Sequence, residues 1–255
     1  MAGATEQGGG QGGQQMPAQP EREVLKRLKA NTREEHELIE ETRIMRALFA
    51  DGFAREHYRM VLTALYGFYA PLEAALKRMP PAGLALAPRL KCDKLAGDLG
   101  DLGCRTRQLG KLPSCARLPE LPDAVGALGA LYVLDGASMG GAVILKHLSG
   151  RLDPKTLRAT RFYQGYGKQT GARWRSLQDA IVEAVRREPA AEERLTATAI
   201  GTFRSMRLWL EAHPVAEAVL PVTEEDSSLA DETSAFSSYL SEDLTSQIGR
   251  RRSTN

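Results

Sequence analysis

The feature that most constrains the fold of this chain is a long stripe of apolar side chains between residues 58 and 76. The apolar positions recur every three or four residues, as they do on one face of an α-helix that packs on a core. They are Tyr58, Val61, Leu62, Leu65, Phe68, Leu72 and Leu76. The same periodicity continues through most of residues 21–213, and no sustained alternation of apolar and polar residues indicates a strand. The sequence therefore predicts an all-α fold.

Prolines and breaks in the periodicity place the boundaries of the predicted helices. We expect helices at residues 21–31, 33–50, 54–79, 89–110, 122–149, 156–164, 170–187 and 191–212. The loops between them contain Pro80, Pro81, Pro113, Pro119 and Pro122. This pattern predicts one helical domain over residues 21–213.

The two ends of the chain differ from this body in composition. Residues 1–20 are rich in Gly and Gln and almost free of apolar side chains, which predicts a disordered segment. Residues 214–255 are rich in Ser, Thr and acidic residues and predict a weakly structured polar tail, with one short helix near "SAFSSYLSEDL". With 255 residues, 42% of them hydrophobic, the chain is long enough for a single core and two tails.

Charge and cysteine content argue against several classes of protein. A net charge of +2 provides no strong attraction to nucleic acid or to an anionic membrane. We expect no membrane span, because no apolar run approaches the ~20 residues that a bilayer requires, and no secretory signal. Cys92, Cys104 and Cys115 are odd in number and lack CxxC spacing, which predicts free thiols in the cytoplasm. A zinc site at these cysteines is disfavoured, because no histidine lies near them.

The segment "KANTREEHELIEE", residues 29–41, places one histidine among charged residues. On a helix that turns by roughly 100° per residue, Lys29, Arg33, His36 and Glu40 fall in one narrow stripe. Such a stripe is ordinarily a solvated helix face. Here apolar residues flank it on both sides, so it could instead line a cleft; they are Leu25, Leu28, Leu38, Ile39 and Met45.

The order of charges along this stripe favours a particular ligand. Glu40, four residues after His36, can accept the proton of one imidazole nitrogen and leave the other nitrogen free to bind a metal. Lys29 and Arg33 precede the histidine, where they suit anionic groups at the edge of a flat ligand. A metal-centred disc with carboxylates at one edge is a haem.

A second segment, "LYVLDGASMGGAVILKHL" at residues 131–148, carries three glycines in an apolar helical run. Each glycine costs a helix roughly 1 kcal/mol relative to alanine. Gly136 and Gly140 are four residues apart, as are Ala137 and Gly141, so they form a strip without bulky side chains. The strip fits close packing between helices, and it equally fits a backbone that approaches a planar ligand on the side opposite His36.

On these motifs the chain resembles the haem oxygenases, all-α enzymes that hold haem between a proximal and a distal helix. The resemblance extends over residues 22–212. "TREEH", Glu40 and "IMRALF" match the proximal helix, and "LYGFYAPLE" matches the helix that follows. "DGASMGGAVILKHL" matches the distal helix and "ATAIGTFRSMRLWLE" the closing helix.

The resemblance implies a role for each candidate residue. His36 would be the axial ligand of the iron, Glu40 its hydrogen-bonding partner, and Lys29 and Arg33 the cations that neutralise the haem propionates. Three distal glycines would lie against haem and bound O₂: Gly136, Gly140 and Gly141. Arg173 and Arg175, in "FYQGYGKQTGARWRSL", are candidates for further propionate contacts.

The resemblance also implies the reaction and its partners. Haem b would be both substrate and cofactor, opened by O₂ to biliverdin, CO and ferrous iron in a monomeric cytoplasmic enzyme. The sequence has no nucleotide-binding fingerprint such as GxGxxG in a βαβ setting, so electrons must come from an external reductant, a ferredoxin or a reductase. The distal motif is similar to that of bacterial members associated with bacteriophytochromes, which makes an apo-bacteriophytochrome a candidate acceptor of biliverdin.

One position departs from the animal members of the family. They carry an aspartate directly after the first distal glycine, where it holds a water network that delivers protons. Here that position is Ala137, and Asp135 should point roughly 200° away from it on a regular helix. This departure keeps one alternative open, a haem-binding protein that stores, transfers or senses haem without degrading it. A second alternative is a thiaminase-like enzyme, which shares the helical architecture and binds no haem.

Overall fold

The structure, a computed structural model, describes residues 19–213, with side chains from residue 23 onward. Within this range it contains eight α-helices, three short 3₁₀ helices and no strand, which confirms the all-α prediction. The α-helices are α1 (Gln19–Glu40), α2 (Arg43–Ala47), α3 (Arg55–Arg78), α4 (Cys92–Asp101), α5 (Thr106–Leu109), α6 (Ala124–Ser149), α7 (Thr170–Arg187) and α8 (Ala191–Ala212). The 3₁₀ helices are η1 (Ala87–Arg89), η2 (Thr156–Arg158) and η3 (Gly167–Gln169). The predicted tail at 214–255 and nearly all of the predicted N-terminal segment lie outside the described residues.

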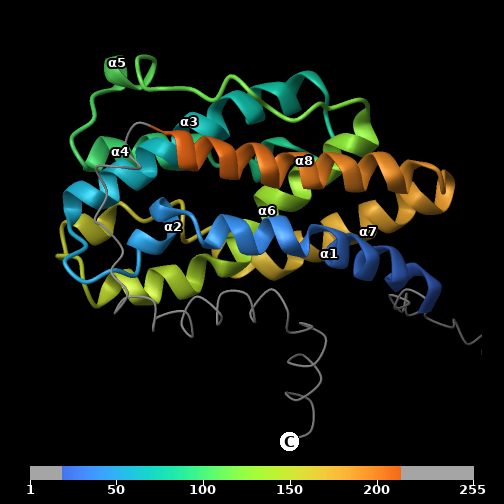
Figure 1. Cartoon of the computed structure of the whole chain (residues 1–255), viewed down its shortest axis with the longest axis horizontal. Coiled ribbons are helices and arrows are strands. Elements are labelled where there is room, and N and C mark those ends of the chain that lie inside the picture. The colour runs from blue at the N-terminus through green and yellow to red at the C-terminus, as the bar shows by residue number, and fades with distance from the viewer. Residues whose placement is uncertain (1–18, 214–255) are drawn as a thin grey trace, which may run out of the picture.

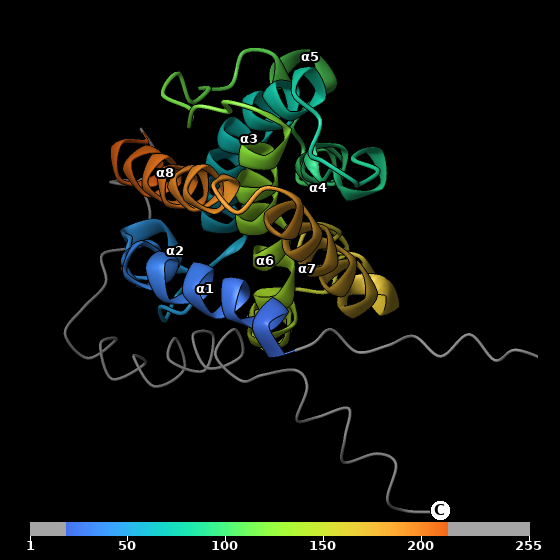
Figure 2. The ribbon, with the colours of Figure 1, turned by 90° about the vertical axis from the view of Figure 1, so that its right-hand side faces the viewer.

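The apolar stripe of α3 is buried throughout, as its periodicity predicts. Helix α6 lies at the centre of the bundle, with α8, α1, α7 and α3 around it (Figures 1 and 2). It packs most closely on α8, while α1 packs on α8 and α7. Helices α1 and α6 therefore face a common pair of neighbours, which fixes their relative position.

Glycine allows the close approach of α6 and α8. A Cβ atom at Gly129 would overlap the backbone oxygen of Leu195 in α8, so a larger residue would push the two helices apart. Asp123 caps the start of α6 by accepting hydrogen bonds from the backbone N–H groups of Val125 and Gly126, at 3.0 and 2.7 Å. The same carboxylate pairs with Arg194 of α8 at 2.7 Å. Both contacts hold the N-terminal half of α6 in place.

Four predicted helices differ from the observed ones. The predicted helices 21–31 and 33–50 are wrong at their boundaries: α1 continues through Thr32, whose hydroxyl donates to the Leu28 carbonyl oxygen at 2.8 Å, and it ends at Glu40, after which α2 is a separate helix. The predicted helix 89–110 is divided into α4 and α5 by Gly103, whose φ of 92° is left-handed. Residues 156–164 form η2 and turns instead of an α-helix.

Of the helices that the structure describes, α6 is long and apolar enough to span a membrane by length and composition. The expectation that no apolar run approaches this length is therefore wrong for residues 124–149. Because 61% of the apolar stretch is buried inside the domain, the position of α6 in the core accounts for its composition. The three cysteines are free thiols, as predicted, with Cys115 buried.

Candidate functional site

His36 and Glu40 lie on the inner side of α1. Their side chains are 19% and 11% exposed, and Nδ1 of His36 lies 3.6 Å from Oε1 of Glu40. The imidazole meets the ring of Phe203 in α8 edge-on, with the ring centres 5.6 Å apart. These two members of the predicted stripe are thus largely removed from water.

Burial sets the charge of this pair. It lowers the pKa of His36 to about 4, against the opposing effect of Glu37, so the imidazole is neutral near pH 7. Burial raises the pKa of Glu40 to about 8, and the negative charges of Glu37 and Glu41 add to this rise. Oε1 of Glu40 has no hydrogen-bond partner within the described part of the chain. A neutral imidazole is able to coordinate a metal ion, and a cation bound to it would favour the carboxylate form of the neighbouring Glu40.

Lys29 and Arg33 lie on the exposed part of the same helix. Nε of Arg33 pairs with Oε1 of Glu37 at 2.6 Å, and the arginine side chain is 74% exposed. Such an ion pair is screened by water and exchanges readily for another anion. The stripe therefore has a buried end at His36 and Glu40 and an exposed cationic end at Lys29 and Arg33.

Helix α6 lies near the part of α1 that carries His36 and Glu40. Burial raises the pKa of Tyr132 in α6, and a hydrogen bond with Thr32 of α1 opposes this rise. The contact brings the turn of α6 that precedes Gly136 next to the turn of α1 that precedes His36. Tyr132 also packs against Trp174 of α7, with ring centres 5.3 Å apart.

The predicted distal glycines do not all face the same way. Gly136 and Gly140 are buried, and a Cβ at Gly136 would lie 3.8 Å from Trp174, an ordinary contact. A Cβ at Gly141 would instead overlap the backbone oxygen of Tyr163. Gly141 therefore allows the segment around Tyr163 to approach α6. At this position the glycine serves close packing within the protein, the first of the two interpretations that the sequence allows.

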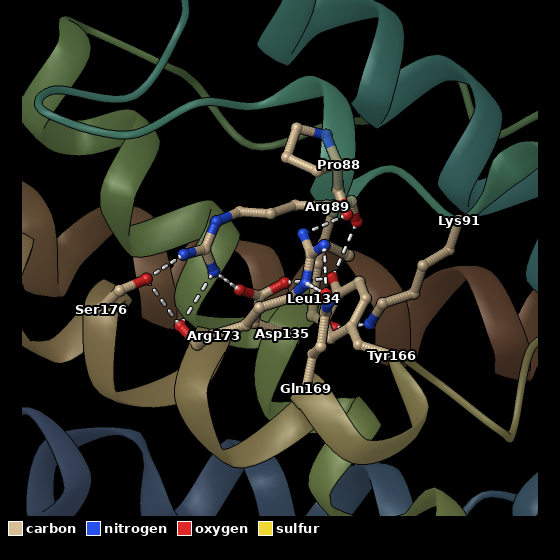
Figure 3. A network of polar contacts seen from close by, with 9 residues as sticks. All are labelled: Pro88, Arg89, Lys91, Leu134, Asp135, Tyr166, Gln169, Arg173 and Ser176. Atoms are coloured by element: carbon tan, nitrogen blue, oxygen red, sulfur yellow. Dashed lines mark hydrogen bonds and ion pairs between the residues drawn. The ribbon is translucent and has the colours of Figure 1, made fainter.

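Asp135, directly before Gly136, belongs to a buried polar network (Figure 3). Its side chain is 1% exposed and forms an ion pair with Arg89 of η1. The Tyr166 hydroxyl lies 2.5 Å from Oδ1 of Asp135 and 2.8 Å from the backbone oxygen of Arg89, so it can donate its one proton to either. Arg89 also donates to the Ser176 hydroxyl of α7 at 2.5 Å. The network links α6 to η1 and α7.

Lys91 completes the network from the same loop. Its ammonium donates to the backbone oxygen of Leu134 and lies 5.4 and 5.8 Å from the ring centres of Tyr166 and Tyr69. Burial lowers its pKa to about 8, although Asp135 and Glu73 oppose this shift. Sequence reasoning did not single out Arg89, Lys91 or Tyr166; it placed the first two in a predicted helix at 89–110, whereas Arg89 ends η1 and Lys91 precedes α4.

The two candidate arginines of α7 have different surroundings. Arg173 donates to the backbone oxygen of Pro88 at 2.5 Å and lies 4.8 Å from the ring centre of Tyr166. Among the described residues, the side chain of Arg173 donates to Pro88, beside η1, and to Gln169, and to no residue of α1. Arg175, two residues further on, is exposed.

Comparison with known proteins gives one match. A family model described as "Heme oxygenase" matches residues 22–212, which cover both α1 with His36 and α6 with its glycines. Neither the curated proteins nor the solved structures give a match.

Proposed function

Because the chain belongs to the haem oxygenase family, we propose that it cleaves haem b to biliverdin, CO and ferrous iron, using O₂ and electrons from an external reductant. Family membership supports a function related to haem. The observation that carries the finer proposal is the buried, neutral His36 beside the unsatisfied carboxyl of Glu40.

His36 would ligate the haem iron. Since Nδ1 faces Glu40, Nε2 is the nitrogen that would ligate the metal. Glu40 would hold the imidazole in this tautomer by accepting the Nδ1 proton. The haem, when bound, supplies the redox chemistry and the O₂-binding iron, while the protein orients it.

The cations at the exposed end of α1 would neutralise the propionates. Lys29 and Arg33 lie in the same stripe as His36, and Arg175 of α7 is a further exposed candidate. The contacts of Arg173 favour another role for that residue, since Pro88 and Gln169 already hold its guanidinium.

Gly136 and Gly140 would allow the distal helix to approach haem, because they present no side chain. Proton delivery would not begin at Asp135, since Arg89 and Tyr166 hold its carboxylate in the network. With Ala137 at the usual aspartate position, another polar group or ordered water must supply the protons.

The remaining partners follow from this chemistry. We expect a monomeric cytoplasmic enzyme that receives electrons from a ferredoxin or a reductase. An apo-bacteriophytochrome is a candidate acceptor of the biliverdin.

An anaerobic haem titration, followed by air, a reductant such as ascorbate, and chromatography of the products, tests the proposal. We expect a Soret band that saturates with haem and then bleaches as biliverdin absorbance appears in the red. A stable Soret band with no biliverdin would favour the second candidate, a non-degrading haem protein, which Ala137 supports. No Soret band would favour the haem-free, thiaminase-like class.

A charge reversal at Lys29 tests the edge of the proposed site. We expect Lys29→Glu to weaken haem binding or to change the ratio of biliverdin isomers, because a carboxylate would repel a propionate. Unchanged affinity and an unchanged isomer ratio would remove Lys29 from the site.

A further inference from the structure

A second polar site lies between the first turn of α4, the end of η1 and the start of α7. It is a surface pocket of about 320 Å³, and its wall includes Lys94, Tyr166, Gln169 and Arg173 but no residue of α1. The pocket is therefore separate from the proposed haem ligands. A volume of this size suits a small molecule.

Two cations of this wall flank one aromatic ring. Nζ of Lys94 lies 5.8 Å from the ring centre of Tyr166, and Cζ of Arg173 lies 4.8 Å from it. Burial lowers the pKa of Lys94, the positive charge of Arg173 lowers it further, and Asp98 opposes the shift. The two like charges thus stand close enough to repel each other.

Neither cation is neutralised by a carboxylate of the described residues. Lys94 donates to the backbone oxygen of Gly165, and Arg173 donates to Pro88 and Gln169, all of which are neutral oxygens. The nearby carboxylate of Asp98 already accepts hydrogen bonds from the side chain of Arg161 and from backbone N–H groups. The pocket therefore carries uncompensated positive charge.

The guanidinium of Arg173 presents a fork that holds an amide. Its Nε and Nη2 donate to the same oxygen, Oε1 of Gln169, at 3.2 and 2.8 Å. Two neighbouring N–H groups of arginine are the usual partners of a phosphate or a carboxylate, which bind them more strongly than a neutral amide does. The exposed Gln169 occupies the position that an oxyanion would take.

We propose that this pocket binds a compact oxyanion with the chemistry of phosphate, which replaces the Gln169 amide at the fork of Arg173 and takes Lys94 as its second cation. The ligand carries at least two negative charges, to match the two cations. It is either a free inorganic phosphate or the phosphate group of a small ester.

Calorimetric titration of the full chain with pyrophosphate, orthophosphate and glycerol phosphate, in a phosphate-free buffer of low ionic strength, tests this proposal. We expect saturable binding of at least one of them, and the preferred probe tells an inorganic ligand from an ester. Lys94→Gln and Arg173→Gln should each weaken binding by about tenfold or more, because each removes a charge-assisted contact. Arg173→Lys, which retains the charge without the fork, should bind more tightly than Arg173→Gln.

Two further variants make the test specific. Gln169→Glu places a carboxylate of the same size at the fork, so it should abolish binding without disturbing the fold. Lys168→Gln removes a neighbouring exposed cation that does not line the pocket, and it should change the affinity by less than about twofold. The proposal fails if none of the probes binds, if Gln169→Glu binds like the parent, or if Lys168→Gln weakens binding as much as Lys94→Gln does.

Discussion

Two buried polar groups in this domain lie close to α6, and they differ in whether their hydrogen bonds are satisfied within the protein. The network of Asp135, Arg89 and Tyr166 pairs its charges and satisfies its hydrogen bonds within the protein. The pair of His36 and Glu40 is neutral, and Oε1 of Glu40 has no partner in the described part of the chain. Because buried polar atoms are usually satisfied in folded proteins, we assign the network to the stability of the fold and keep the pair as the proposed ligand site.

The comparison predicts its largest effect on stability at Asp135. Asp135→Ala should lower the free energy of unfolding by roughly 3–5 kcal/mol, because it leaves the charge of Arg89 buried without its partner. Urea denaturation followed by circular dichroism measures this loss. A loss below about 1 kcal/mol would show that the network does not hold α6 in place.

The glycines of α6 provide a matched pair. Gly141→Ala should destabilise the domain by roughly 1–3 kcal/mol, because its Cβ would overlap the Tyr163 carbonyl. Gly136→Ala should leave stability unchanged or raise it by up to about 1 kcal/mol, since its Cβ has room and alanine favours a helix. The same denaturation experiment compares them, and equal losses would contradict the distinction between the two positions.

Removing one hydroxyl from the network should have an intermediate effect. Tyr166→Phe takes away a hydrogen-bond donor that Asp135 and the Arg89 carbonyl share, so we expect a loss of roughly 1–2 kcal/mol in unfolding free energy. The ring remains, which preserves its contacts with Lys91 and Arg173. A stability equal to that of the parent would mean that the hydroxyl is dispensable to the network.

The smallest effect on stability is expected at Glu40. Glu40→Gln should change the free energy of unfolding by less than about 0.5 kcal/mol, because the buried carboxyl is already neutral near pH 7. Haem affinity, measured by titration of the Soret band, should nevertheless fall by roughly tenfold to a hundredfold, as it does when the partner of a ligating histidine is replaced. A large loss of stability with unchanged haem binding would reverse the assignment of roles.

The sequence predicts the parts of the fold that depend on periodicity. The buried stripe of α3 and the bounds of α7 and α8 follow from spacing alone, and the pairing of His36 with Glu40 follows from their four-residue separation. The continuity of α1 through Thr32 does not, because a threonine is compatible with a helix interior and with a break; here its hydroxyl donates to the Leu28 carbonyl oxygen inside the helix.

The network behind α6 could not be predicted in the same way. Arg89 and Lys91 lie at the end of η1 and directly before α4, where the sequence predicts the start of a helix, and they meet Asp135 and Leu134 over more than forty residues of chain. A charged residue in an apolar glycine-rich helix, Asp135, was the one available signal that a partner must exist, because a buried carboxylate requires one. Which residue would be that partner is decided by the tertiary structure.

The most direct test of the central claim, that His36 binds the haem iron, is the absorption spectrum and turnover of His36→Ala with and without added imidazole. The account predicts that the variant folds, changes the spin state of the iron, loses biliverdin formation, and partly recovers both when imidazole is supplied. A variant that retains the spectrum and turnover of the parent would contradict it.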